Sequence, residues 1–100
     1  ENKRPNIPAP QTWEIRKRET VEHLKKASID TKVIVLADKT ANLESIVKEQ
    51  RHITGDIWKK FNQTDKEKQA WYFRAVREQL TEFSDTSVIK KYDAYLEILF

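Results

Sequence analysis

The chain has no cysteine, a single glycine, Gly55, and three prolines that all fall within residues 1–11. The absence of cysteine excludes disulfides and thiolate chemistry, although it does not fix the cellular compartment. No apolar run is long enough to span a bilayer, and the N-terminus lacks the apolar core of a signal peptide, so we expect no membrane segment. With few helix breakers and many Lys, Glu, Gln and Leu residues, the composition predicts an all-α fold.

Charge and aromatic residues are abundant in the 100 residues. Charged residues make up 35% of the chain, the net charge is +3, and ten residues are aromatic. Acids and bases alternate along the chain without the basic stripe of a duplex-binding protein, so nucleic acid is not an expected partner. The length fits one small domain. Because the sequence begins without Met, we expect a fragment or a processed product.

Helical periodicity and capping residues divide the chain into five expected segments after an extended, proline-containing lead-in over residues 1–11. Candidate N-caps are Thr12, Ser28, Thr64 or Asp65, and Thr86 or Ser87, and Gly55 is the expected stop signal. The sequence therefore predicts a single bundle of about five helices, with these approximate ranges: 13–26, 30–51, a short aromatic segment over 57–62, 65–83 and 86–99.

The most apolar stretch, VIVLADKTANLESIV at residues 33–47, lies inside the second of these helices. Its apolar residues are so numerous that we expect this helix to be central, with neighbours on several sides. It carries one acid, Asp38, among apolar turns, and Asn42 one helical turn later. An acid in an apolar setting must be paired, bind a metal or stay protonated.

Two interpretations of Asp38 and Asn42 remain open from the residues alone. Asp38 is either a buried acid satisfied by Lys39 or by another basic side chain, or a metal ligand beside an Asn42 that binds a substrate hydroxyl. A metal site needs further ligands, which the surface-type His23 and the turn residue His52 do not obviously supply.

Two further groups of polar residues attract attention. The basic cluster at residues 16–18 is expected to be a solvated helix face, with phosphate contact as the alternative. Lys68 and Tyr72 form an i, i+4 pair on one helix.

The octapeptide Leu-Ala-Asp-Lys-Thr-Ala-Asn-Leu at residues 36–43 resembles a motif of HD-domain metal-dependent phosphohydrolases, in the (p)ppGpp hydrolase-like branch. The preceding TWEIRKRETVEHLKKAS and the later GDIWKKFN and KQAWYFRAV resemble the segments that flank this motif in the family. The resemblance covers about residues 12–80. It implies that Asp38 binds a divalent metal, Mn²⁺, and that Asn42 holds the ribose of a guanine nucleotide. It also implies that Lys39, Lys68 and Tyr72 line the substrate pocket, with Lys68 on phosphate.

The family's other metal ligands, a first His and a paired His-Asp, precede this helix and do not occur in these 100 residues. The resemblance therefore implies the C-terminal half of an HD-type domain, with an incomplete Mn²⁺ site and inactive when isolated. The expected parent activity is (p)ppGpp 3′-pyrophosphohydrolysis in the cytoplasm. The alternative is a non-catalytic helical interaction or nucleotide-binding module. We also expect self-association through apolar surface left uncovered.

Overall fold

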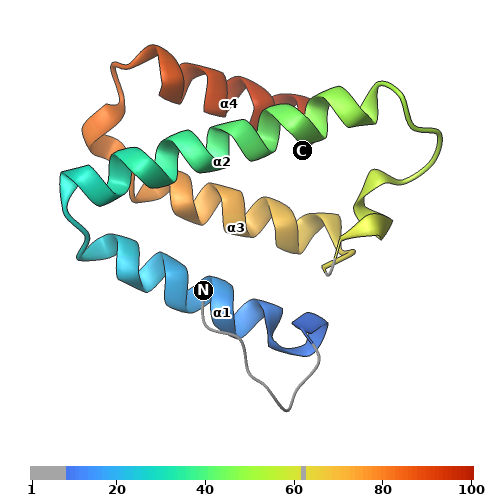
Figure 1. Cartoon of the computed structure of the whole chain (residues 1–100), viewed down its shortest axis with the longest axis horizontal. Coiled ribbons are helices and arrows are strands. Elements are labelled where there is room, and N and C mark those ends of the chain that lie inside the picture. Colours follow the sequence, from blue (N-terminus) through green and yellow to red (C-terminus); the bar gives the residue numbers. More distant parts are fainter. Residues whose placement is uncertain (1–8, 62) are drawn as a thin grey trace.

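The computed structural model describes residues 9–61 and 63–100, with side chains from residue 12 onward. Within these ranges all regular secondary structure is helical, and the all-α prediction is confirmed. Figure 1 shows four α-helices, and two short 3₁₀ helices lie in the connections. The short aromatic segment expected over residues 57–62 forms the first of these 3₁₀ helices. The elements in chain order are α1 (Ala9–Lys25), α2 (Ile29–Gln50), η1 (Ile57–Lys60), α3 (Lys66–Glu78), η2 (Thr81–Phe83) and α4 (Ser87–Leu99).

Side-chain caps start three of the α-helices where the sequence predicts them. The side chain of Ser28 accepts a hydrogen bond from the backbone N–H of Thr31 at the start of α2. Asp65 caps α3, and Thr86 caps α4. Each cap satisfies a backbone donor that would otherwise lack an intrahelical partner.

The prediction that Thr12 caps the first helix is wrong, because α1 already begins at Ala9. Pro10 fits this first turn, where its missing N–H is not needed for an intrahelical hydrogen bond. Thr12 is instead buried, and its hydroxyl accepts a hydrogen bond from Arg16. The expected extended lead-in is thus wrong for residues 9–11, and its first eight residues lie outside the described ranges.

Two helices end earlier than the sequence suggests. Helix α2 stops at Gln50, and Gly55 takes its positive φ of 95° within the following loop, a conformation that L side chains rarely adopt. Helix α3 ends at Glu78 instead of residue 83, and the backbone turns at Leu80 before η2. Leu80 is fully buried at this turn, as its place in the amphipathic pattern suggests.

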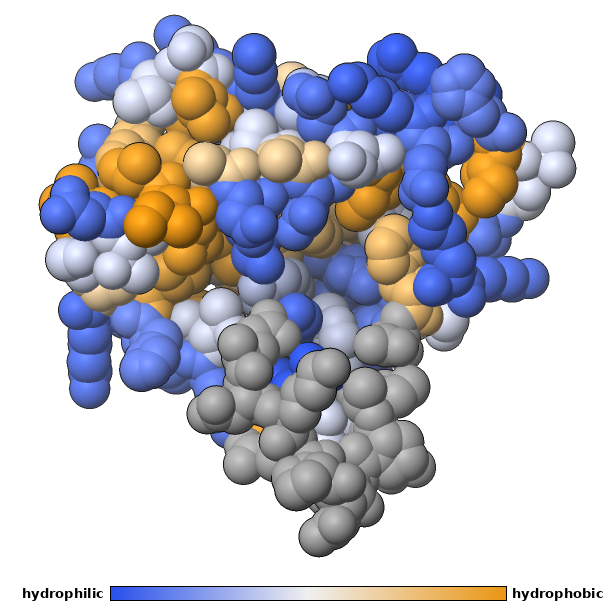
Figure 2. Space-filling model, viewed as in Figure 1, coloured by the Kyte–Doolittle hydropathy of each residue, from blue (hydrophilic) through white to orange (hydrophobic). Residues whose placement is uncertain are grey.

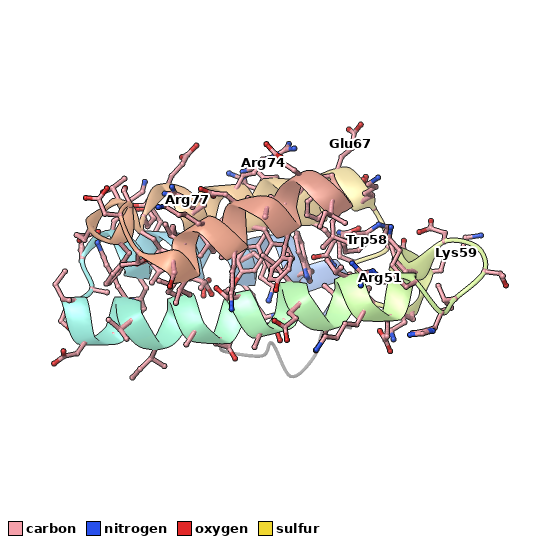
Figure 3. All side chains as sticks on the ribbon, turned by 90° about the horizontal axis from the view of Figure 1, so that it is seen from above. Arg51, Trp58, Lys59, Glu67, Arg74 and Arg77 are labelled. Carbon is pink, nitrogen blue, oxygen red and sulfur yellow. The ribbon has the colours of Figure 1, made fainter. Side chains whose placement is uncertain are left out.

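The helices form a flattened body of 35 × 35 × 18 Å. Figure 3 shows α2 along one side of the molecule, with α3 and α4 on the other side. The core lies between these helices, and five side chains at its centre are at most 1% exposed. They are Leu43, Val76, Leu80, Ile89 and Tyr92.

Tyr92 is the largest fully buried side chain of the protein. Its hydroxyl donates a hydrogen bond of 2.6 Å to the backbone carbonyl of Phe73, so α4 is joined to α3 inside the core. Burial raises the pKa of Tyr92 far above its ordinary value, and the hydroxyl therefore stays a donor at every pH at which the protein is studied.

An aromatic group closes the end of the bundle where the C-terminal residue lies. Trp58 in η1 is 4% exposed and stacks on Phe100, with ring centroids 5.1 Å apart. Ile57 is also buried, while Phe61 is partly buried against the core. Helix η1 thus brings the side chains of Ile57 and Trp58 into the core.

Among the described residues, α2 has neighbours on one side only, and its other side leaves apolar surface uncovered, as expected for this chain. Val33 is 47% exposed and Ile34 is 69% exposed. The described helices all pack against the same side of α2, so its opposite face has no covering element among the described residues (Figure 3). Periodicity shows that a helix is apolar on several sides, but it does not show how many partners are present.

One ion pair between distant segments gives a pH-dependent prediction for folding. The ammonium of Lys32, on a largely buried side chain, donates to Glu82 across 2.7 Å and lowers the pKa of that carboxyl below its ordinary value near 4.5. A carboxyl whose pKa is lowered by folding stabilises the protein above its unfolded pKa, and this contribution disappears as the pH falls through the folded pKa.

We therefore expect Glu82→Gln to lower the urea midpoint at neutral pH and to match the wild-type midpoint at about pH 3. Glu97→Gln, at an exposed position on α4, is the control and should leave both midpoints unchanged. A Glu82→Gln deficit that persists undiminished in acid would contradict the assignment to this ion pair.

Candidate functional site

Two of the cavities on the described part of the chain lie on opposite sides of α3. The outer cavity has a volume of about 660 Å³ and is formed by one face of α3 together with Phe100. The second cavity, called the basic groove, has a volume of about 400 Å³ and lies among α1, α2, η1 and α3. They differ in the charge of the side chains that line them.

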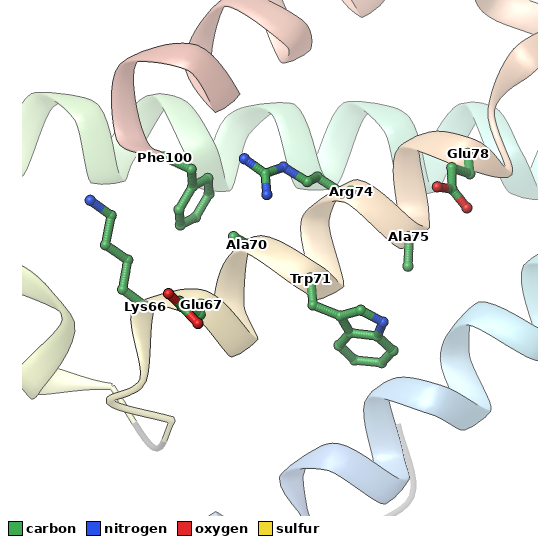
Figure 4. A pocket seen from close by; sticks show the side chains of 8 residues that line it. All are labelled: Lys66, Glu67, Ala70, Trp71, Arg74, Ala75, Glu78 and Phe100. Atoms are coloured by element: carbon green, nitrogen blue, oxygen red, sulfur yellow. The ribbon is translucent and has the colours of Figure 1, made fainter.

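The outer cavity has balanced charges. Figure 4 shows Lys66 and Glu67 at the start of α3, Arg74 beside Phe100 and Glu78 near the end of the helix. Glu67 and Arg74 lie on the side of the molecule away from α2 (Figure 3). Two cations and two carboxylates leave no net charge to attract an anion.

The basic groove is lined by four cationic side chains and one carboxylate. The carboxylate, Glu49, is already paired with Lys60. A concave wall with an excess of one sign of charge raises the local concentration of oppositely charged ligands. The cations are Arg16, Lys17, Lys39 and Lys60, and the aromatic lining residues are Trp13, Trp58, Phe61, Tyr72 and Phe73.

Tyr72 organises the cations of the basic groove. The ammonium nitrogen of Lys17 lies 4.8 Å from the centroid of the Tyr72 ring, and that of Lys39 lies 5.5 Å from it. Both distances allow a cation–π interaction. Helices α1 and α2 thus each direct one ammonium group to the same ring on α3.

Neighbouring groups stabilise the protonated, positively charged form of Lys39. Burial alone would lower the pKa of Lys39, but the Tyr72 phenol group and the Asp38 carboxylate outweigh this effect and raise the pKa above its ordinary value. The ammonium therefore remains protonated at neutral pH, in a side chain that is only 16% exposed. A positive charge held in this way is suited to a phosphate oxygen.

Asp38 and Asn42 lie at the edge of α2 next to the basic groove. The premise that Asp38 sits in an apolar setting is wrong, because its side chain is 62% exposed and borders solvent. Its carboxylate is 3.4 Å from the ammonium of Lys39, so the predicted pairing with Lys39 is present at the surface. Asn42 lines the groove together with Lys39 and Tyr72.

Lys68, the other residue expected to contact substrate, does not line the basic groove. It is exposed in the first turn of α3 and lies near α1. A hydrogen bond from Arg18 is the main cause of the lowered pKa of Glu14, and the charge of Lys68 contributes to it. The structure thus brings four of the five sequence-derived site residues together and leaves Lys68 apart from them.

The described residues contain no group of three or more His, Cys, Asp or Glu side chains that could hold a metal ion. The charge nearest to Asp38 is the cation Lys39, and both histidines are exposed residues elsewhere. One carboxylate is too few for Mn²⁺, so these residues alone do not fit the metal that the resemblance implies. Asp38 remains a single candidate ligand.

The prediction of a solvated face for residues 16–18 holds only for Arg18, which is exposed and pairs with Glu14. Arg16 is 7% exposed, and Lys17 is half-buried in the groove. A signal for this was available, because Trp13 and Lys17 have the i, i+4 spacing that places two side chains on one helix face. Without the position of α3, that face could not be distinguished from one in solvent.

Comparison of the chain with protein-family models, with curated proteins and with solved structures gave no match. The HD-type family therefore stays a prediction that rests on the residues of the motif and its flanks. Among the described residues, no helix combines the length and the apolar character needed to cross a bilayer.

Proposed function

We propose that this chain is the nucleotide-phosphate-binding part of an HD-type phosphohydrolase, with (p)ppGpp as the leading substrate and the cytoplasm as its compartment. The observation that carries the proposal is the basic groove, where Lys17 and Lys39 meet at Tyr72 next to Asp38 and Asn42.

Charge favours a phosphate ligand in this groove. Two ammonium groups near one ring repel each other, and an anion placed between or beside them relieves that repulsion. Because both side chains are at least half-buried, their attraction for a phosphate is screened less by solvent than at an open surface. The balanced outer cavity offers no comparable attraction.

Each groove residue has a distinct task in this proposal. Lys17 and Lys39 hold phosphate oxygens, and Tyr72 keeps both ammonium groups in place through its ring. The amide of Asn42 hydrogen-bonds a ribose hydroxyl, since an amide can both donate and accept. Asp38 supplies one carboxylate at the edge of the groove. Hydrolysis is proposed only for a protein that brings further metal ligands to that edge.

The second candidate is a module that binds a nucleotide without hydrolysing it. The surroundings of Asp38 favour this candidate for the chain itself, because its carboxylate is paired with Lys39 and is not grouped with other acids or histidines of the described part. Both candidates share the basic groove and predict the same binding residues. Release of pyrophosphate distinguishes them, because only the phosphohydrolase releases it.

A nucleotide-binding measurement tests the basic groove as a phosphate site, which both candidate functions require. We expect ppGpp to bind the chain and to change the fluorescence of Trp13 or Trp58, which line the groove. Lys39→Ala should weaken binding by about 10-fold or more, the effect of losing one hydrogen bond between charged groups. Lys90→Ala removes the same charge from an exposed position on α4 and should leave the affinity within about twofold.

In the same titration, the affinity should depend on the phosphate groups of the ligand. Guanosine, which carries no phosphate, should bind far more weakly than ppGpp, and raised salt should weaken ppGpp binding. Equal affinity of the Lys39→Ala and Lys90→Ala variants for ppGpp would exclude the basic groove as the phosphate site. No binding of ppGpp by the folded wild-type chain would remove both candidates.

A further inference from the structure

One face of α2 has the pattern of a helix-packing surface without a partner. We define the α2 ridge as Asp30, Ile34, Ala37, Ala41, Ser45 and Lys48, residues that follow one another at intervals of three or four. All six are exposed, and Ser45 also borders the basic groove. Intervals of three and four place side chains in one row along a helix.

The first half of the ridge is apolar. Figure 2 shows a hydrophobic patch over the N-terminal half of α2, in the same view as Figure 1. Ile29, Val33 and Ile34 contribute to it with exposures of 50%, 47% and 69%. A contiguous apolar patch on one element marks an interaction site far more often than single exposed residues do.

The middle of the ridge permits close approach. Ala37 and Ala41 are one turn apart and carry only a methyl group each, so a second helix can come near the backbone of α2 there. Larger side chains on both sides, such as Ile34, can then enter the grooves of that second helix.

The charged residues at the two ends of the α2 ridge indicate that the partner helix is a second copy of α2. Asp30 lies in the first turn of α2, and Lys48, whose ammonium is 3.1 Å from the Glu44 carboxylate of the same helix, lies in the last turn. If a second α2 crosses in the antiparallel direction with a two-fold axis near Lys39, Asp30 of one copy faces Lys48 of the other at both ends. Ala37 then faces Ala41. A parallel pair would instead place like charges opposite each other.

We propose that two copies of this chain associate through the α2 ridge in an antiparallel, two-fold symmetric pair. Such a contact is self-complementary, so both copies use the same residues. The helix dipoles also run in opposite directions, which favours this arrangement. Lys39 and Ile46 line the basic groove outside the ridge, and Ser45 lies where the ridge borders the groove.

Sedimentation equilibrium of the whole chain tests the proposal. We expect a reversible monomer–dimer equilibrium with a dissociation constant of roughly 100 µM, as suits one small interface. Ile34→Asp should weaken association by about 10-fold or more, since it places charge in the apolar contact. Ile98→Asp is the matched control, because Ile98 is 52% exposed on α4 and lies outside the ridge.

A charge exchange tests the antiparallel direction separately. Asp30→Lys should weaken the dimer several-fold, and the double variant Asp30→Lys/Lys48→Asp should return to within about twofold of the wild-type affinity. Circular dichroism should be the same for all variants because the altered side chains are exposed.

Three results would overturn the proposal. They are a monomer at every concentration, equal effects of Ile34→Asp and Ile98→Asp, or a double charge variant that associates more weakly than Asp30→Lys. None of these results bears on nucleotide binding, which is measured at concentrations where the chain is monomeric.

Discussion

Leu43→Ala lowers the free energy of unfolding by about 3 kcal/mol, within the range measured for leucines removed from tightly packed cores. Leu43 is 0% exposed and lies on the face of α2 that packs against the core. Truncation removes apolar contacts and leaves a cavity, because neighbouring helices relax only partly. Urea unfolding followed by circular dichroism measures the loss. For a domain of 100 residues the melting temperature should fall by more than 10 °C, as about 1 kcal/mol corresponds to 4–8 °C.

Ile34→Ala is the control for this prediction, since it removes a comparable volume from the same helix. Ile34 is 69% exposed, and at a few micromolar protein the change should be less than about 0.5 kcal/mol. Equal losses for the two variants would mean that the opposite face of α2 is buried. The orientation of α2 described above would then be wrong.

The second large effect concerns hydrolysis by the complete natural protein. If the proposed phosphohydrolase activity is present, Asp38→Ala should reduce Mn²⁺-dependent pyrophosphate release from ppGpp by more than about 100-fold, because a candidate metal ligand is removed. Binding of ppGpp by the variant should change much less, since Lys17 and Lys39 remain in the basic groove.

Asp85→Ala provides the control, because Asp85 is an exposed acid near the start of α4 and outside the groove. Wild-type release of pyrophosphate that Asp38→Ala leaves intact would exclude Asp38 as a metal ligand. If the folded wild-type protein binds ppGpp with Mn²⁺ present but releases no pyrophosphate, the module that only binds a nucleotide is the better description.

Local chemistry made much of the fold predictable. Ser28, Asp65 and Thr86 cap helices because each side chain satisfies a backbone donor only two or three residues away. The short segment at 57–62 was expected to bury its aromatic side chains, and Trp58 does so. These features depend on neighbouring residues and are therefore visible in the sequence.

Features that depend on tertiary packing could not be predicted. The burial of Arg16 and the position of Lys17 over Tyr72 require α1 to lie against α3. The end of α3 at Glu78 depends on where Leu80 finds the core. Lys68 and Tyr72 share the spacing of one helix turn, but only Tyr72 lines the groove, while Lys68 is exposed outside it.

The candidate site was also predicted only in part from the sequence. The motif at residues 36–43 directed attention to the correct edge of α2, where Lys39 and Asn42 line the basic groove. It did not indicate that Asp38 would be open to solvent, since an apolar sequence around an acid does not determine which face is covered. The excess of positive charge in the groove comes from α1, α2 and the η1 segment, which are distant in the sequence.

The most direct test of the central claim is a ¹H–¹⁵N correlation spectrum of the chain titrated with ppGpp at a concentration where it is monomeric. We expect the largest shift changes at Lys17, Lys39, Asn42 and Tyr72, and small changes at Lys66 and Arg74 in the outer cavity. Changes centred on the outer cavity, or spread evenly over all lysines, would contradict the account of the basic groove as a specific nucleotide-phosphate site.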